Sequence, residues 1–244
     1  MIDAIILFLS AMAGGSLVFF ISKKRTKEMQ MAITFSGAYL FSLTILHILP
    51  ELYEDSHTDG HIVSLFILLG FFFQVLLEPL TSGVEHGHLD EHHSHKHHHP
   101  VTPLIIGMLI HATFDGAILS GNFLNHGHGQ NNLMIGLVLH KIPAAFALVS
   151  VISQSLSSKK KVFTLLIIFA LASPFGIFAS NFLFQKMAVD HMYYNLLIAV
   201  VAGNFLHIST TIFFETSPEH QFNFRKMFIT LLGVLLAIAV EFIL

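Results

Sequence analysis

Eight long apolar stretches divide this sequence, and they constrain its fold more than any other feature. They cover residues 2–21, 31–49, 62–80, 103–121, 133–151, 162–184, 196–214 and 227–244. A helix of about 20 apolar residues crosses the hydrocarbon core of a bilayer, and it satisfies its own backbone hydrogen bonds in lipid. The sequence lacks the polar–apolar alternation of membrane β-strands. It therefore predicts an all-α integral membrane protein with eight transmembrane helices, in a single membrane domain over residues 1–244.

The composition excludes several classes of protein. Hydrophobic residues make up 54% of the chain and charged residues only 11%, whereas an ordinary globular domain is about a quarter charged. A disordered chain, a disulfide-stapled secreted domain and a nucleic-acid-binding protein are all excluded. The 18 His outnumber the 12 Lys and Arg, and there is no Cys. Histidine in such excess indicates metal or proton chemistry with nitrogen and oxygen ligands.

Lysine and arginine are distributed unevenly between the two sides of the predicted helices. The connections after the first, third, fifth and seventh stretches hold ten of them, whereas those on the other side hold only Lys186. Positively charged connections stay in the cytoplasm, so we expect both termini to be extracytoplasmic. The first stretch has no positive segment before it, which favours a retained helix over a cleaved signal peptide. We expect the protein to lie in the cell membrane.

The longest connection, residues 81–102 between the third and fourth stretches, is rich in histidine and is predicted to be cytoplasmic. Its histidines are His86, His88, His92, His93, His95, His97, His98 and His99. Such a tract is typical of auxiliary metal binding, and a solvated polar loop without a dedicated function is the alternative. For the smaller cluster of His126 and His128, the solvated loop is the favoured interpretation.

Two neighbouring stretches carry ionisable residues near their centres. An Asp or Lys at such a depth costs about 2.5–3.5 kcal/mol, so it usually faces the bundle interior and marks a function. His111 and Asp115 are four residues apart and share one helical face. With His140 from the next stretch they would form a three-ligand site for a divalent metal. Lys141 either pairs with Asp115 or supplies the charge of a second metal, and a purely structural polar cluster is the alternative.

Two helix ends carry a similar pattern at opposite faces of the membrane. His47 precedes a Pro-Glu pair that ends in Glu51, and Glu215 precedes one that ends in Glu219. Opposed ends of this kind suit the entrance and the exit of a transport pathway. His207 lies deeper in the seventh stretch and is expected to line that pathway, with a hydrogen bond to a neighbouring helix as the alternative.

These motifs, in their order and spacing, resemble the ZIP (Zrt-, Irt-like protein) family of divalent metal transporters over nearly the whole chain. The residues concerned are Gly37-Ala38-Tyr39-Leu40, His47-Ile48-Leu49-Pro50-Glu51, His111 to Gly116, His140-Lys141, Ser173-Pro174-Phe175-Gly176, Ala202-Gly203-Asn204-Phe205-Leu206 and Glu215. The resemblance implies a 3+2+3 arrangement of the helices, a homodimer, and an elevator-like or rocking alternation of access. It also implies a metal site formed by His111, Asp115 and His140, and movement of zinc or iron toward the cytoplasm.

The chain departs from the family pattern at three positions. Many members have Asn where this chain has Ala112, and acidic residues where it has Lys141 and Ala144. The two-metal centre of those members therefore cannot be carried over, and we expect a single metal ion. Weak, open coordination suits transport, because the ion must also leave.

The predicted function is transport of divalent metal cations toward the cytoplasm, with zinc as the first expected substrate and iron, manganese and cadmium as the others. The expected partners are the metal ion, the lipid bilayer and a second copy of the chain. A non-transporting membrane metal sensor or metal-binding protein is the alternative, favoured by the altered motif at Lys141. The sequence lacks the His-Glu-x-x-His motif of a common zinc protease, and we predict no enzymatic activity.

Overall fold

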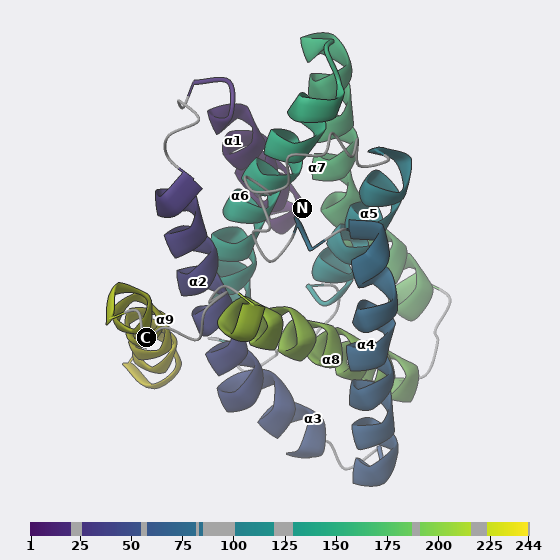
Figure 1. Cartoon of the computed structure of the whole chain (residues 1–244). Coiled ribbons are helices and arrows are strands. Elements are labelled where there is room, and N and C mark those ends of the chain that lie inside the picture. Colours follow the sequence, from purple (N-terminus) through teal and green to yellow (C-terminus); the bar gives the residue numbers. More distant parts are fainter. Residues whose placement is uncertain are drawn as a thin grey trace.

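The computed structural model describes residues 1–20, 26–54, 58–81, 83–84, 101–119, 129–186, 191–215 and 224–243, and this part of the chain contains helices and no strand. The helices are α1 (Ile2–Leu17), α2 (Thr26–Leu43), η2 (Thr44–Ile48), α3 (Leu49–Glu54), α4 (Gly60–Thr81), α5 (Val101–Ala117), α6 (Gly129–Ser155), α7 (Lys159–Asn181), η4 (Phe182–Lys186), α8 (His191–Glu215) and α9 (Phe224–Ile243). Figure 1 shows them as a bundle. The all-α prediction is confirmed.

Each predicted apolar stretch overlaps a helix, although not every helix has the length of a membrane span. Among the described residues, five helical segments are long and apolar enough to cross a bilayer: Glu28–Glu54, Gly60–Thr81, Asn131–Ser155, Lys159–Phe184 and Met192–Phe213. The apolar helices α1 and α5 are shorter, at 16 and 17 residues. The full set of eight transmembrane helices, the 3+2+3 arrangement and the extracytoplasmic termini therefore stay predictions.

Side chains cap the starts of two helices. The Ser158 side chain accepts a hydrogen bond from the backbone N–H of Lys161 at 3.4 Å and caps the start of α7. Asp59 accepts one from the backbone N–H of His61 at 2.8 Å, at the start of α4. Both caps satisfy N–H groups that the first turn of a helix leaves without partners.

The outer surface of the bundle is apolar. On α4, Leu65, Leu69, Phe72 and Leu76 are each more than half exposed, and their spacing places them on one face of the helix. Exposed apolar side chains also follow α7 and α9, including Phe175. A soluble monomer rarely exposes apolar surface of this extent. Together with the long apolar helices, this surface identifies an integral membrane protein.

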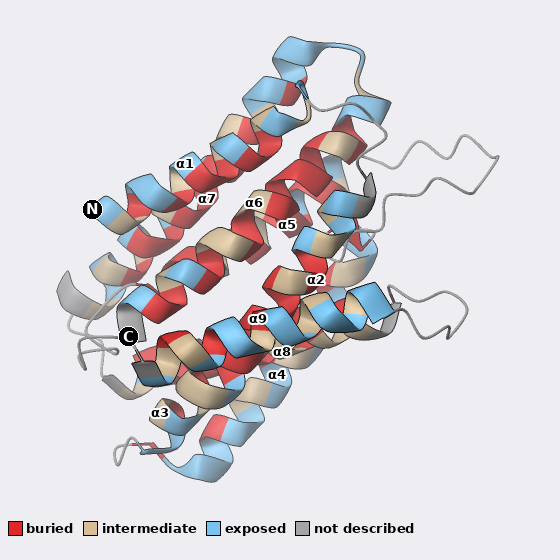
Figure 2. Cartoon of the chain, turned by 90° about the vertical axis from the view of Figure 1, so that its left-hand side faces the viewer, coloured by how far each residue is buried: buried red, intermediate tan, exposed pale blue. Residues whose placement is uncertain are grey.

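The helices form two groups, and α2 contacts both of them extensively. In the first helix group, α1 packs against α6 and α7, and α5 packs against α7. In the second helix group, α8 packs against α4 and α2, and α2 packs against α9. The groups meet where α2 contacts α6 and where α4 contacts α5. In Figure 2 the two chain ends lie at the same end of the bundle.

Paired glycines bring helix backbones into direct contact inside each group. A Cβ atom on Gly116 of α5 would collide with a backbone carbonyl of α7, and one on Gly176 of α7 would collide with a carbonyl of α5. Gly70 and Gly203 join α4 and α8 in the same reciprocal way. Small residues permit such close approach in membranes. The contact at Gly116 fixes the helical turn that carries Asp115.

Candidate metal site

Helices α5 and α6 bring four ionisable side chains together in the interior of the first helix group. His111 and Asp115 lie one turn apart on α5, and His140 and Lys141 are consecutive on α6. Each of the four residues is 1% exposed. The residues that the sequence analysis selected at mid-membrane depth are therefore neighbours in the structure.

The two histidines are spaced like two ligands of one metal ion. The Nε2 atoms of His111 and His140 lie 3.4 Å apart, and the two rings meet edge to face with centroids 5.6 Å apart. Two nitrogen ligands of a tetrahedral zinc ion, each about 2.0–2.1 Å from the metal, are separated by about 3.3 Å. Asp115 Oδ2 lies 3.6 Å from His111 Nε2, slightly farther than that spacing.

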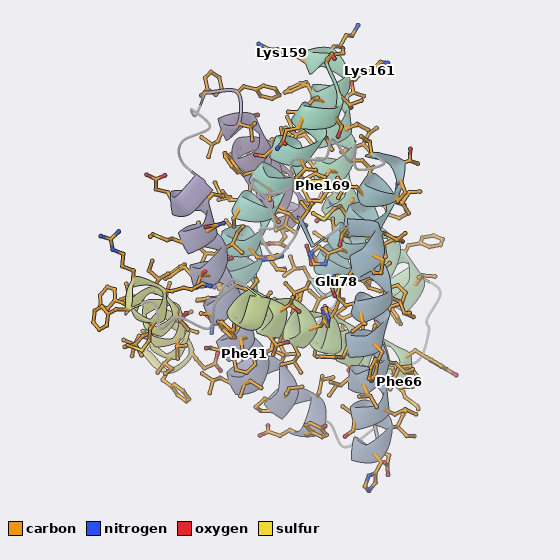
Figure 3. All side chains as sticks on the ribbon, in the orientation of Figure 1. Phe41, Phe66, Glu78, Lys159, Lys161 and Phe169 are labelled. Carbon is orange, nitrogen blue, oxygen red and sulfur yellow. The ribbon has the colours of Figure 1, made fainter. Side chains whose placement is uncertain are left out.

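Lys141 forms an ion pair with the carboxylate of this cluster. Its Nζ donates a hydrogen bond to Asp115 Oδ2 at 2.5 Å, and this is the same oxygen that faces His111. The ammonium also lies 5.3 Å from the centroid of the Phe169 ring on α7, and Figure 3 shows Phe169 inside the bundle. Of the two roles considered for Lys141, the structure contains the ion pair with Asp115.

Three polar atoms of the cluster are buried without a hydrogen-bond partner among the described residues: His111 Nδ1, His140 Nδ1 and Asp115 Oδ1. A buried polar atom left in this way costs about 1–3 kcal/mol. The same described part of the chain holds no group of three or more His, Asp or Glu side chains that is arranged to take a metal ion as it stands. The arrangement is thus a pair of histidines beside a carboxylate that an ammonium already engages.

His47 belongs to a second cluster, in which the sequence analysis missed one member. His47 Nδ1 lies 3.1 Å from Glu241 Oε1 of α9, and His47 Nε2 lies 3.5 Å from Glu51 Oε2 of α3. Asn132 Nδ2 of α6 donates a hydrogen bond to the other oxygen of Glu241 at 3.1 Å. We call His47, Glu51 and Glu241 the outer cluster. The available signal for Glu241 was a lone carboxylate in an otherwise apolar stretch.

His207 of α8 meets a carboxylate of α4. Its Nε2 lies 3.6 Å from Glu78 Oε2, and its ring contacts Phe71 edge to face at 5.0 Å. Glu78 is labelled beside α8 in Figure 3. This polar contact with a neighbouring helix is of the kind that the sequence analysis gave as the alternative for His207.

The other predicted site residues lie at or beyond the edge of the described structure. Glu215 is the last residue of α8, and its side chain lies outside the described part of the structure. Glu219 and all eight histidines between residues 86 and 99 lie outside the described residues. The exit role of the two glutamates and the metal-binding role of the tract therefore stay predictions.

Fold and site together describe a helical membrane protein with a polar cluster buried between two of its helices. Residues 101–241, more than half of the chain and including the whole α5–α6 cluster, match the family model described as ZIP zinc transporter. The chain belongs to the ZIP zinc transporter family.

Two curated relatives illustrate the similarity. Zinc transporter ZIP9 of Micropogonias undulatus is 26% identical over 167 residues, which are 65% of this chain and 53% of that protein. Zinc transporter ZIP9 of Xenopus tropicalis is 28% identical over 124 residues, which are 50% of this chain and 41% of that protein. The chain thus spans about half the length of the curated relatives it matches.

Proposed function

We propose that this chain transports divalent metal cations across the cell membrane toward the cytoplasm, with zinc as the main substrate and His111, Asp115 and His140 as its central binding site. The observation that carries the proposal is the 3.4 Å separation of two imidazole nitrogens that are buried beside a carboxylate. Family membership supports zinc as the transported ion. Iron, manganese and cadmium are further candidate substrates, since the same ligands bind them with different affinities.

The proposed pathway has three stations. A hydrated ion first meets the outer cluster, where the carboxylates of Glu51 and Glu241 attract it. It then binds at the α5–α6 site, and it leaves past His207, Glu215 and Glu219 toward the His-rich tract. Two histidines and one shared carboxylate give incomplete coordination, which allows the ion to leave again.

The placement of the site in one helix group supports alternating access. His111, Asp115, His140 and Lys141 all belong to the first helix group, whereas His207 and most of the outer cluster's contacts belong to the second. Movement of the first group relative to the second would carry the bound ion from one station toward the next. A homodimer, in which a second copy holds one group fixed in the bilayer, is part of this proposal.

The test is zinc flux into proteoliposomes that contain a trapped zinc indicator. Saturable flux in the native protein, lost in Asp115→Ala and His140→Ala, would support the proposal. Matched controls are Glu54→Ala and His61→Ala. Both residues are exposed and belong to neither α5 nor α6, so their loss should leave the flux unchanged. Native flux in Asp115→Ala would refute the proposed site.

A metal sensor or metal-binding protein remains the second candidate function. The observation that favours it is the ion pair between Lys141 and Asp115, which occupies Oδ2, the carboxylate oxygen that faces His111. Absence of flux for every ion tested, together with one metal bound per chain, would support this candidate. The family is one of transporters, and we propose no enzymatic activity.

A further inference from the structure

Lys141 is a cation built into the interior of the protein at the place where a metal ion would bind. It is 1% exposed, so its charge is removed from water. A buried charge persists when a partner of opposite charge compensates it, and Asp115 is that partner at 2.5 Å. The empty site therefore carries one positive and one negative charge, and the two cancel.

The geometry places this ammonium in competition with a metal ion. Lys141 Nζ bonds to Asp115 Oδ2, which is also the carboxylate oxygen that lies 3.6 Å from His111 Nε2. An ion held by the histidines and this oxygen would share the oxygen with the ammonium or displace it. Two positive charges this close in a poorly solvated interior repel strongly, so displacement is favoured over sharing.

The structure also offers the displaced ammonium a second contact. The Phe169 ring centroid lies 5.3 Å from Nζ, within the range of about 6 Å over which a ring face attracts a cation. A rotation of the long, flexible Lys141 side chain toward this ring would release Asp115 Oδ2 without bringing the ammonium into lipid.

We propose that Lys141 is a tethered counter-cation: it neutralises Asp115 whenever the site is empty, gives way to the metal on loading, and so allows the empty site to return across the membrane. The inference rests on the proposed transport function. Lys141 acts through Asp115 and is thus a positioning residue.

The proposal predicts two separate consequences of Lys141→Met. Without its competitor, the site should bind zinc at least about tenfold more tightly, since a tenfold change needs only about 1.4 kcal/mol of binding free energy. The empty site would now carry a lone buried carboxylate, and its return would be slow. Net zinc uptake should therefore fall severalfold, while zinc-for-zinc exchange, which needs no empty return, should be retained.

The experiment measures zinc affinity in detergent by competition with a chromophoric chelator, and then net uptake and exchange of labelled zinc in proteoliposomes. Lys141→Arg keeps the charge and should keep affinity and the ratio of net uptake to exchange closer to native than Lys141→Met does. The matched control is Lys159→Met, because Lys159 projects from the exposed end of α7 (Figure 3). If Lys141→Met fails to insert, Lys141→Gln removes the charge but retains a donor to Asp115, and it is put through the same measurements.

The outcomes separate the two proposals. Unchanged zinc affinity in the charge-removing variant, or equal losses of net uptake and exchange, would overturn the role of Lys141 while leaving the transport function standing. If the native protein moves no zinc in either mode, the transport function fails. In that case the affinity measurement alone still decides whether Lys141 competes with metal.

Discussion

The buried pair of Lys141 and Asp115 gives a quantitative prediction about stability that does not depend on transport. At 2.5 Å, the attraction between the two charges is about 7 kcal/mol for an effective dielectric constant of about 20. Burial of each ion costs several kcal/mol, so the intact pair contributes little net stability. Removal of one partner is different, because it leaves an uncompensated charge in the interior.

We therefore expect Lys141→Met and Asp115→Asn each to lower the free energy of unfolding by about 3–5 kcal/mol in the absence of metal. The double variant should be much less destabilised than the sum of the two single variants, because no charge remains to be compensated. The coupling energy from the double-mutant cycle should then exceed about 2 kcal/mol. Since both side chains are almost fully buried, screening by solvent does not reduce these figures.

The assay is unfolding of the purified protein in a fixed detergent mixture, followed by circular dichroism, with a chelator present throughout. Zinc is then added to each variant, and it should stabilise Lys141→Met more than the native protein. The exposed Lys159→Met serves as the control, and a change within about 0.5 kcal/mol is expected for it. Single variants that each cost less than 1 kcal/mol, or a double variant whose cost is the simple sum, would refute the reasoning.

Two further predictions follow from the packing and the clusters. Gly116→Ala and Gly176→Ala should each lower the free energy of unfolding by about 1–3 kcal/mol, measured in the same unfolding assay. Native stability in both variants would mean that α5 and α7 are not in backbone contact. Gly60→Ala is the control, because a Cβ atom there would meet only ordinary van der Waals contacts. Glu241→Gln should raise the KM for zinc severalfold with little effect on the maximal rate, since it removes one charge from the outer cluster. A fall in the maximal rate as large as the rise in KM would argue against an attracting role.

Hydropathy located the helices well, because a long apolar stretch leaves the backbone few alternatives in lipid. It could not reveal how the second stretch ends. That stretch was predicted as residues 31–49, whereas the helix continues from α2 through η2 and α3 to Glu54. The π-helical turn of η2 carries His47, and such turns are frequent at functional sites. Its wider turn is a matter of backbone geometry, and the apolar pattern does not record it.

The candidate site was predictable where it depended on helical spacing. His111 and Asp115 share a face because they are four residues apart, and this needs no knowledge of the tertiary fold. The pairing of Lys141 with Asp115 was one of two alternatives, since the sequence cannot fix the rotation of α6 relative to α5. The contact between His47 and Glu241 joins residues far apart in the chain. It depends on how α9 packs against α2, which no local pattern specifies.

The glycine contacts indicate where the molecule is rigid and where it is able to move. Inside the first helix group, Gly14, Gly116 and Gly176 face backbone atoms of neighbouring helices, so these helices cannot slide without breaking close main-chain contacts. At the junctions between the groups, Gly107 and Gly136 instead face the side chains of Thr81 and Tyr39. Side chains change rotamer at lower cost than backbones change position. The helix backbones that carry the α5–α6 cluster should therefore keep their mutual positions while the first helix group shifts as a unit, and the Lys141 side chain stays able to change rotamer.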